Sequence, residues 1–219
     1  FRNKREQRSS VIFTVMELRL SKDIEELTTK RYSTGYTNLF ISLPQREGIH
    51  SYLPFKLQIK PDLPHLYSGA WFEFTIKFNP GYPFKPPEVF ALNQVYHPNI
   101  DLDTGKVYCE ALLVDNWKPV MTANSIIFAV ELLLYEPNFQ SIPPNPMNEE
   151  MAYLCQNNLQ EFYCRVKQTL EGGLFCNKYL FKQNYSSSTN KKRLGRHSDE
   201  PFKKIKTNES HSMQLEANL

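Results

Sequence analysis

Hydrophobic residues near the start of the chain recur every three or four positions, and charged residues fill most positions between them. This spacing is typical of an α-helix with one buried face and predicts a helix that begins at Ser10. Residues 1–9 are mostly polar and basic, and we expect a loose, flexible arm there. The hydrophobic positions of the helix are Phe13, Met16, Leu20, Ile24 and Leu27.

The next part of the chain alternates between hydrophobic and polar residues, which is typical of strands with one buried side. Residues 71–78 read WFEFTIKF and show the alternation most clearly. Similar segments occupy residues 36–43 and 53–60, and the proline-rich turn YPFKPPEVF leads into a short fourth strand. Short polar loops separate these segments, so the pattern predicts an antiparallel four-stranded meander.

Helical spacing returns in three segments after the loop that contains HPNI. The first begins at a Thr122 cap and ends before Pro137, and the second begins at an Asn148 cap, because both residue types favour the position before a helix. The third ends at Gly172–Gly173. The order of helix, strands, loop and helices predicts an α+β fold.

The composition is that of a globular protein, since 41% of the 219 residues are hydrophobic. No apolar run reaches the roughly 18 residues of a membrane span, and no signal sequence opens the chain. We therefore expect an intracellular protein without a membrane partner.

Seven of the 26 Lys and Arg and four of the 23 Asp and Glu lie in residues 183–219. The neutral remainder argues against nucleic acid as a partner.

Residues 183–219 are rich in Ser and Asn and too poor in apolar residues to fold. We expect a disordered basic tail there, outside a folded core of residues 10–182. Two basic clusters lie within Lys191–Lys206 and allow two interpretations. The first is a solvated tail without a function. The second is a functional segment, either a nuclear-import signal or a tether to an acidic partner. The second interpretation places the protein in both the cytoplasm and the nucleus.

The four cysteines, at positions 109, 155, 164 and 176, form no CxxC pair and have no His at ligand spacing. Structural zinc sites use such close pairs, so we expect no metal. Cys155 and Cys164 fall inside predicted helices, where free cysteines usually pack. Cys109 lies between two polar turns instead, where a thiol is more available.

The loop around Cys109 contains residues that suit acyl chemistry at sulfur. Asn99 carries an amide that can donate a hydrogen bond to a developing oxyanion without titrating. His97 is a candidate general base, but it precedes Pro98 in the same loop, which favours a structural imidazole. A cysteine-protease arrangement and a carrier of acyl groups both stay open on these residues alone.

Several motifs resemble those of the ubiquitin-conjugating enzymes, the carriers of the ubiquitin cascade. In chain order they are YPFKPPEV, HPNI with a glycine and a cysteine after it, WKP, and EPN followed by NP. Four motifs in this order are far more specific than HPN alone, and they cover roughly residues 10–173. Within the family, MELRLSKDIEEL, VYHPNIDL, QNN and EGG are most similar to the carrier of the Rub/Nedd modifier.

The resemblance implies a reaction and its partners. Cys109 would accept the C-terminal glycine of a ubiquitin-like modifier from an activating enzyme as a thioester, and pass it to a lysine, in this branch typically on a cullin. Asn99 would support the oxyanion or hold the loop that does, and His97 would brace that loop. The activating enzyme uses the ATP, so no cofactor is expected, and the carrier would act as a monomer.

The resemblance also implies two loops that meet a RING-type ligase. Pro83 and Phe84 would lie on the first loop, and Trp117, Lys118 and Pro119 on the second. We expect partner contact from Phe84 and Pro119, and core packing from Trp117.

The sequence departs from the family around the thiol. The family cysteine stands three residues after the loop glycine, whereas GKVYC has four, and one further residue precedes Gly105. The loop after Pro137 is about four residues longer than usual, and Asn145 stands where a carboxylate often lies near the attacking lysine. Glu110 is expected to raise the pKa of Cys109. These changes predict a slower enzyme.

Two alternatives stay open. The first is a carrier of ubiquitin itself, which would differ in its modifier and its activating enzyme. The second is a scaffold of the same fold with weak or lost catalysis. The GKVYC insertion allows this second alternative, although inactive members usually lack the cysteine that this chain keeps.

Overall fold

The structure, a computed structural model, describes residues 2–30, 35, 37–41, 52–60 and 65–184. The side chains of residues 2–14 lie outside this description, and so does the predicted tail from residue 185 onward. In chain order the elements are α1 (Arg2–Thr29), β1 (Thr37–Ile41), β2 (Tyr52–Ile59), β3 (Trp71–Lys77), β4 (Glu88–Ala91), the short 3₁₀-helix η1 (Glu110–Leu112), α2 (Ala123–Tyr135), α3 (Pro146–Asn157), α4 (Leu159–Glu171), β5 (Gly173–Phe175) and β6 (Tyr179–Phe181).

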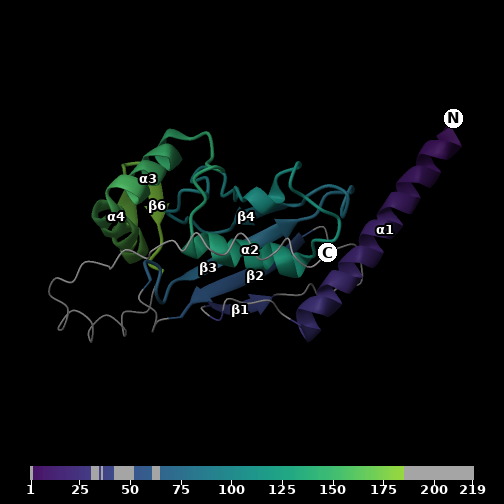
Figure 1. The fold of residues 1–219 in the computed structure, drawn as a ribbon, viewed down its shortest axis with the longest axis horizontal. Coiled ribbons are helices and arrows are strands. Elements are labelled where there is room, and N and C mark those ends of the chain that lie inside the picture. The colour runs from purple at the N-terminus through teal and green to yellow at the C-terminus, as the bar shows by residue number, and fades with distance from the viewer. Residues whose placement is uncertain (1, 31–34, 36, 42–51, 61–64, 185–219) are drawn as a thin grey trace, which may run out of the picture. The chain divides into compact units, whose positions relative to one another are not determined.

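Strands β1 to β4 form an antiparallel sheet in the order β1-β2-β3-β4, so the predicted meander is confirmed (Figure 1). The register places Phe55 of β2 opposite Phe74 of β3, and their rings stack at a centroid distance of 5.3 Å. Alternate side chains of each strand bury one face of the sheet. The buried members on β2 and β3 are Leu53, Phe55, Leu57, Ile59, Phe72, Phe74 and Ile76.

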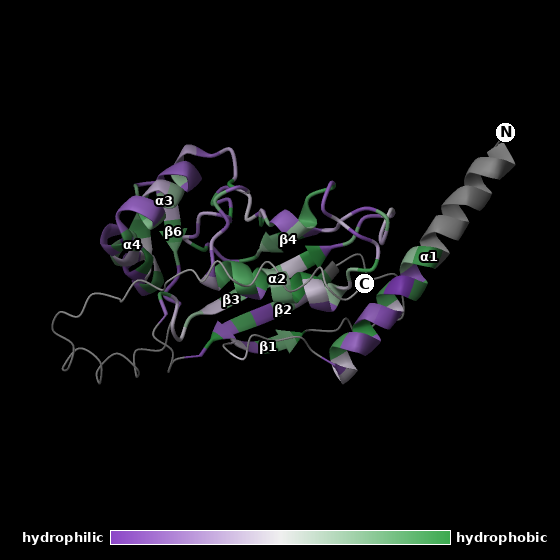
Figure 2. Ribbon diagram, viewed as in Figure 1, coloured by the Kyte–Doolittle hydropathy of each residue, from purple (hydrophilic) through white to green (hydrophobic). Residues whose placement is uncertain are grey.

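Helix α2 lies across this sheet (Figure 1), and hydrophobic residues occupy most of its length (Figure 2). A capping box fixes its N-terminus, because the Ser125 N–H donates to Thr122 Oγ1 and the Thr122 N–H donates to Ser125 Oγ. The predicted Thr122 cap is therefore confirmed. The predicted core positions Ile126, Ile127, Val130, Leu133 and Leu134 are all buried.

Helix α1 begins at Arg2 rather than at Ser10. Residues 2–9, which we predicted as a loose arm, therefore continue the helix. In its described part the apolar spacing buries one face, as predicted, except that Ile24 is only half-buried. The buried side chains of this part are Met16, Leu20, Asp23 and Leu27.

The predicted cap of α3 is wrong, because the helix begins at Pro146 with Asn145 as its cap. Asn145 Oδ1 accepts a hydrogen bond from the Met147 N–H at 3.0 Å. Asn148, the predicted cap, lies inside the first turn and is fully buried. The helix therefore starts three residues earlier than we predicted.

The folded domain includes a β5–β6 hairpin after α4, and its contacts continue past the predicted core end at residue 182. The β5–β6 hairpin packs Phe175 against Tyr96, with ring centroids 5.2 Å apart. Beyond the hairpin, Asn184 Oδ1 accepts from the Trp71 N–H at 3.0 Å, and the Asn184 N–H donates to Leu170 O at 2.9 Å. These contacts join the described C-terminal end to β3 and α4.

The helical cysteines differ in their surroundings. Cys155 is half-buried and packs against the core. Cys164 is exposed, so the prediction that it packs in the interior is wrong. It lies two residues after the buried Phe162, which places it on another face of α4.

Candidate active site

A short hairpin-like segment joins Asn99 to the cysteine loop. The Tyr108 N–H donates to Asn99 O at 2.8 Å, and Ile100 pairs with Val107 in an antiparallel bridge. Cys109 follows this paired segment directly. Asn99 and Cys109 are ten residues apart in sequence, but this pairing brings Tyr108, the residue before Cys109, next to Asn99.

The tip of this segment is a turn held by Asp101. Asp101 Oδ1 accepts from the N–H groups of Asp103 at 2.9 Å and Thr104 at 2.7 Å. Gly105 has a φ of 73°, and a Cβ there would stand 2.4 Å from Ala91 O, so only glycine fits. Residues 102–105 therefore form the turn, and the stem before and after it is paired through Ile100 and Val107.

His97 braces the base of this segment. Its ring is fully buried, Nε2–H donates to Leu133 O of α2 at 2.9 Å, and Nδ1 accepts from the Asn99 N–H at 3.0 Å. Burial lowers its pKa to about 4. The imidazole is therefore neutral with both nitrogens engaged, which disfavours a general base.

Asn99 is also fully buried, and its side chain contacts the loop that follows α2. Its Nδ2 donates to Asn138 O and to Ser141 O, the latter at 2.9 Å, and its Oδ1 accepts from the Asn138 N–H at 3.0 Å. Both amide hydrogens are thus used on backbone carbonyls. Of the two roles that the resemblance implied, these contacts favour holding the loop over donating to an oxyanion.

Asn148, which we predicted as a helix cap, instead positions the backbone around Asn99. Its Nδ2 lies within hydrogen-bond distance of the carbonyls of His97 at 3.2 Å, Pro98 at 2.9 Å and Ile100 at 2.8 Å. Helix α3 therefore fixes the backbone on both sides of Asn99. The NP motif before Asn148 gave no signal for this contact, because it depends on where α3 packs.

Cys109 is only 8% exposed, so its loop position does not make it freely available as predicted. It directly precedes η1. Burial raises the pKa of the Cys109 thiol, and the Glu110 charge raises it further, while hydrogen bonds from the N–H groups of Ala111 and Leu112 partly offset both effects. The predicted effect of Glu110 is present, but burial is the larger cause.

Glu110 is exposed, yet its carboxylate has a defined partner. Asn138 Nδ2 donates to Glu110 Oε2 at 2.9 Å. Since Asn99 holds the backbone of Asn138, hydrogen bonds connect the buried Asn99 with Glu110, the residue after Cys109. Glu110 stood out in the sequence by its charge, whereas the contact of Asn138 gave no signal there, although Asn138 belongs to the EPN motif.

Asn145 does not lie free beside the thiol loop. Besides capping α3, it donates from Nδ2 to Asp103 Oδ2 at 3.1 Å. Asp103 also pairs with Lys178 of the β5–β6 turn at 2.7 Å, and this hydrogen bond lowers the pKa of the Asp103 carboxyl. Asn145 thus joins α3 to the tip of the turn.

The two loops predicted to meet a ligase contact each other. Trp117 is buried, and its Nε1–H donates to Pro83 O at 2.6 Å. Phe84 is 71% exposed, and Lys118 and Pro119 are exposed as well. Trp117 therefore packs, whereas the residues beside it are open to a partner.

A buried carboxylate, Asp23, joins α1 to these loops, and its place among other charged residues of the helix gave no signal of this in the sequence. Asp23 accepts hydrogen bonds from Tyr82 Oη and from the Ala123 N–H, and Arg19 pairs with it at 2.8 Å. Arg19 also donates to Met121 O at 2.8 Å. Burial raises the pKa of Asp23, and the Tyr82 hydrogen bond and the Arg19 charge partly offset this.

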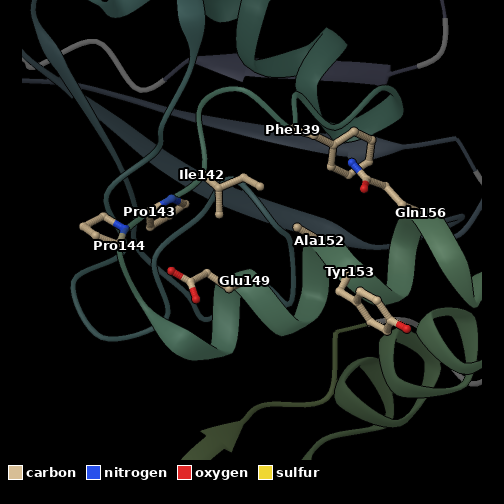
Figure 3. Close-up of a pocket in the computed structure, with 8 residues that line it drawn as sticks. All are labelled: Phe139, Ile142, Pro143, Pro144, Glu149, Ala152, Tyr153 and Gln156. Atoms are coloured by element: carbon tan, nitrogen blue, oxygen red, sulfur yellow. The ribbon is translucent and has the colours of Figure 1, made fainter.

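A shallow cavity of about 480 Å³ lies between helix α3 and the long loop that follows α2. Figure 3 shows the loop side chains on one side of it and those of α3 on the other. The lining residues are Phe139, Ile142, Pro143, Pro144, Glu149, Ala152, Tyr153 and Gln156.

Within the described part of the chain, no group of three His, Cys, Asp or Glu side chains is arranged to hold a metal ion. No helix of that part is long and apolar enough to cross a membrane.

Comparison with known proteins agrees with this geometry. The sequence matches the family model described as "Ubiquitin-conjugating enzyme" over residues 19–170. It is 39% identical over 157 residues to the Nedd8-conjugating enzyme UbcE2M of Drosophila melanogaster, which covers 72% of this chain and 78% of the relative. It is 37% identical over 160 residues to the NEDD8-conjugating enzyme UBC12 of Yarrowia lipolytica, covering 73% of this chain and 80% of the relative.

A solved structure gives the same picture. The fold matches S. cerevisiae Ubc12 with a TM-score of 0.62 and 26% sequence identity, covering 84% of this chain and 95% of the yeast chain. The chain belongs to the ubiquitin-conjugating enzyme family. It is therefore a transferase of ubiquitin-like modifiers with the α+β fold of that family.

Proposed function

We propose that this protein carries a Nedd8-type modifier as a thioester on Cys109 and transfers it to substrate lysines. The observation that carries the proposal is the similarity to relatives from fungi, an insect, a plant and an amoeba. Those relatives are all named as NEDD8-conjugating enzymes. The polar frame around the buried Cys109 supports it, because a thioester needs one thiol and a fixed loop around it.

We further propose three partners besides the modifier: its activating enzyme, a RING-type ligase and a cullin that supplies the lysine. The exposed side chains of Phe84, Pro119 and Val120, the last of them 76% exposed, support a ligase contact on the two paired loops. The protein would act as a monomer inside the cell, in the cytoplasm and the nucleus. It would need no cofactor of its own, since the activating enzyme uses the ATP.

Ubiquitin itself is the second candidate modifier, because the thiol site does not depend on the identity of the attached chain. The third candidate, a scaffold with weak catalysis, rests on the two extra residues between Asn99 and Cys109. One of them precedes Gly105 in the turn, and the other lies between Gly105 and Cys109. The Tyr108 N–H nevertheless donates to Asn99 O, and this pairing favours a working thiol over an inactive one.

A charging assay tests the proposal. The protein is incubated with ATP and either Nedd8 or ubiquitin, each with its own activating enzyme, and resolved on non-reducing gels. We expect a reductant-sensitive adduct with Nedd8. Cys109→Ser should give an adduct that resists reductant, because an oxyester forms in place of the thioester.

Cys155→Ala is the matched control, since Cys155 is a half-buried thiol in α3 and should leave the adduct unchanged. Normal charging of Cys109→Ala would overturn the assignment of the nucleophile. Charging with ubiquitin alone would overturn the choice of modifier.

A further inference from the structure

The exposed carboxylate next to Cys109 has a hydrogen-bond partner on the loop after α2. Glu110 follows Cys109 directly and accepts a hydrogen bond from Asn138 Nδ2 at 2.9 Å. Long exposed side chains lose rotamer freedom when they are fixed, at a cost of up to roughly 2 kcal/mol. A fixed position for Glu110 therefore requires a framework behind it.

Asn99 supplies that framework. It is fully buried, and its amide binds both the N–H and the C=O of Asn138. Asn138 Oδ1 also accepts from the Gln140 N–H at 2.8 Å, which fixes the side chain from a second direction. The carboxylate of Glu110 is thus positioned from the buried interior, through two asparagines.

The transfer step requires a group of this kind. A lysine side chain has an ordinary pKa near 10.4, so it arrives as an ammonium and must lose a proton before its nitrogen can attack. Asn145 cannot accept a proton, and both ends of its amide are engaged by Met147 and Asp103. Asp103 is paired with Lys178 at the tip of the turn, several residues from the thiol.

We propose that Glu110 is a catalytic carboxylate that receives the ammonium of the acceptor lysine, and that Asn138 is its positioning residue. This inference rests on the proposed function, because it concerns the second half of that reaction. A carboxylate within reach of the lysine ammonium can accept its proton before the nitrogen attacks the carbonyl carbon.

The step balances in atoms and charge. One proton passes from the lysine ammonium to the Glu110 carboxylate, and the neutral nitrogen forms a bond to the carbonyl carbon of the thioester. The C–S bond then breaks, its electron pair goes to Cys109 Sγ, and the sulfur takes the second proton from nitrogen. Glu110 finally releases its proton to water. The products are an isopeptide and a free thiol.

The test separates two nucleophiles on the same thioester. Full-length protein is charged with whichever modifier it accepts, purified from the activating enzyme, and mixed with free lysine or with hydroxylamine, which is largely unprotonated at neutral pH. For Glu110→Gln we expect lysine discharge to slow about 100-fold, the lower end of the range for loss of a general base. Hydroxylamine discharge should stay within about twofold, because it has no such proton to lose.

Three further variants sharpen the result. Glu110→Asp should recover part of the lysine rate, and Asn138→Ala should lower it by less than Glu110→Gln does, since the carboxylate remains but is no longer held. Asp115→Asn removes an exposed carboxylate of the next turn and is the matched control, with no change expected for either nucleophile.

Each outcome decides something different. An unchanged lysine rate in Glu110→Gln, or an equal loss with lysine and hydroxylamine, would overturn the inference while leaving the carrier function intact. An Asn138→Ala variant with the wild-type ratio of the two rates would remove the positioning role. Absence of any thioester on the wild-type protein would instead refute the proposed function.

Discussion

The sheet with α2 and the segment around Cys109 both contain fully buried side chains, but different forces hold them. In the sheet, side chains such as Phe74 and Ile76 pack against one another without directional bonds. In the active-site segment, His97, Asn99 and Asn148 are as deeply buried and bind backbone groups through oriented hydrogen bonds. Packing gives the domain its stability, whereas the amides fix where the thiol loop lies.

The largest expected effect comes from breaking the packed region. Phe74→Ala removes a ring that is fully buried and stacked on Phe55, and should lower the free energy of unfolding by roughly 3–5 kcal/mol. The variant that remains folded should discharge its thioester to lysine at the wild-type rate, because the amide contacts are unchanged. Urea unfolding and single-turnover discharge measure the two quantities.

Thr75→Ala, on the other face of the same strand, should change the free energy of unfolding far less. A large loss of discharge rate in folded Phe74→Ala would show that the two regions are not independent.

The second effect concerns pH and the buried histidines. Burial lowers the pKa of His97 to about 4, and that of His65 likewise to about 4. The unfolded chain binds these protons near pH 6.5, so the stabilisation is complete above about pH 6.5 and is lost as the pH falls toward about 4. His97 alone should contribute about 3 kcal/mol to this loss. Urea unfolding at several pH values in this range measures the slope of the free energy of unfolding against pH.

His97→Gln replaces the imidazole with an amide that can still form hydrogen bonds but does not titrate. We expect a shallower slope, with the His65 contribution still present, and His65→Gln is the matched variant for the other half. An unchanged slope in His97→Gln would mean that the buried imidazole does not govern the acid sensitivity.

The third effect distinguishes an anchor from an oxyanion donor at Asn99. Loss of a direct oxyanion donor typically slows the chemistry about 100-fold or more. Because both amide hydrogens bind carbonyls, we expect Asn99→Ala to slow lysine discharge only about 10-fold, a loss smaller than that of a direct donor. A double-mutant cycle with Asn138→Ala should show coupling of roughly 0.5–3 kcal/mol. Additive effects would favour independent roles for the two asparagines.

The sequence predicted the packed region well and the amide framework poorly. The periodicity of residues 71–78 identified the strand and its buried face, because period and burial are linked by geometry. The loop composition and the resemblance both indicated Cys109, Asn99 and His97 as candidate site residues. Neither could show that Asn148 binds the HPN carbonyls or that Asn138 binds Glu110, since an asparagine suits a cap, a turn or a buried anchor equally well.

The smallest expected effect is at the C-terminal end of the domain. Deleting residues 187–219 removes none of the described contacts and should leave the free energy of unfolding and the charging rate unchanged. Deleting residues 183–219 also removes the two hydrogen bonds of Asn184, which should cost about 1–2 kcal/mol. Equal stability of the two truncations would show that Asn184 does not stabilise the domain.

The variant that lacks only residues 187–219 is also the one with which to test the basic clusters, because it keeps the hydrogen bonds of Asn184. An unchanged nuclear fraction in cells, with an unchanged salt dependence of transfer, would leave only a solvated tail.

The turn at residues 101–105 shows how a paired stem can separate spacing in sequence from spacing in the fold. The Tyr108 N–H donates to Asn99 O, and Ile100 pairs with Val107. Pairing decides which residues of the two arms face each other, and the number of residues in the turn between them does not. Cys109 therefore directly follows the partner of Asn99, although this chain has two more residues between its Asn and Cys than the family pattern. A motif search that permits a longer gap at this turn would recover sequences that a fixed spacing rejects.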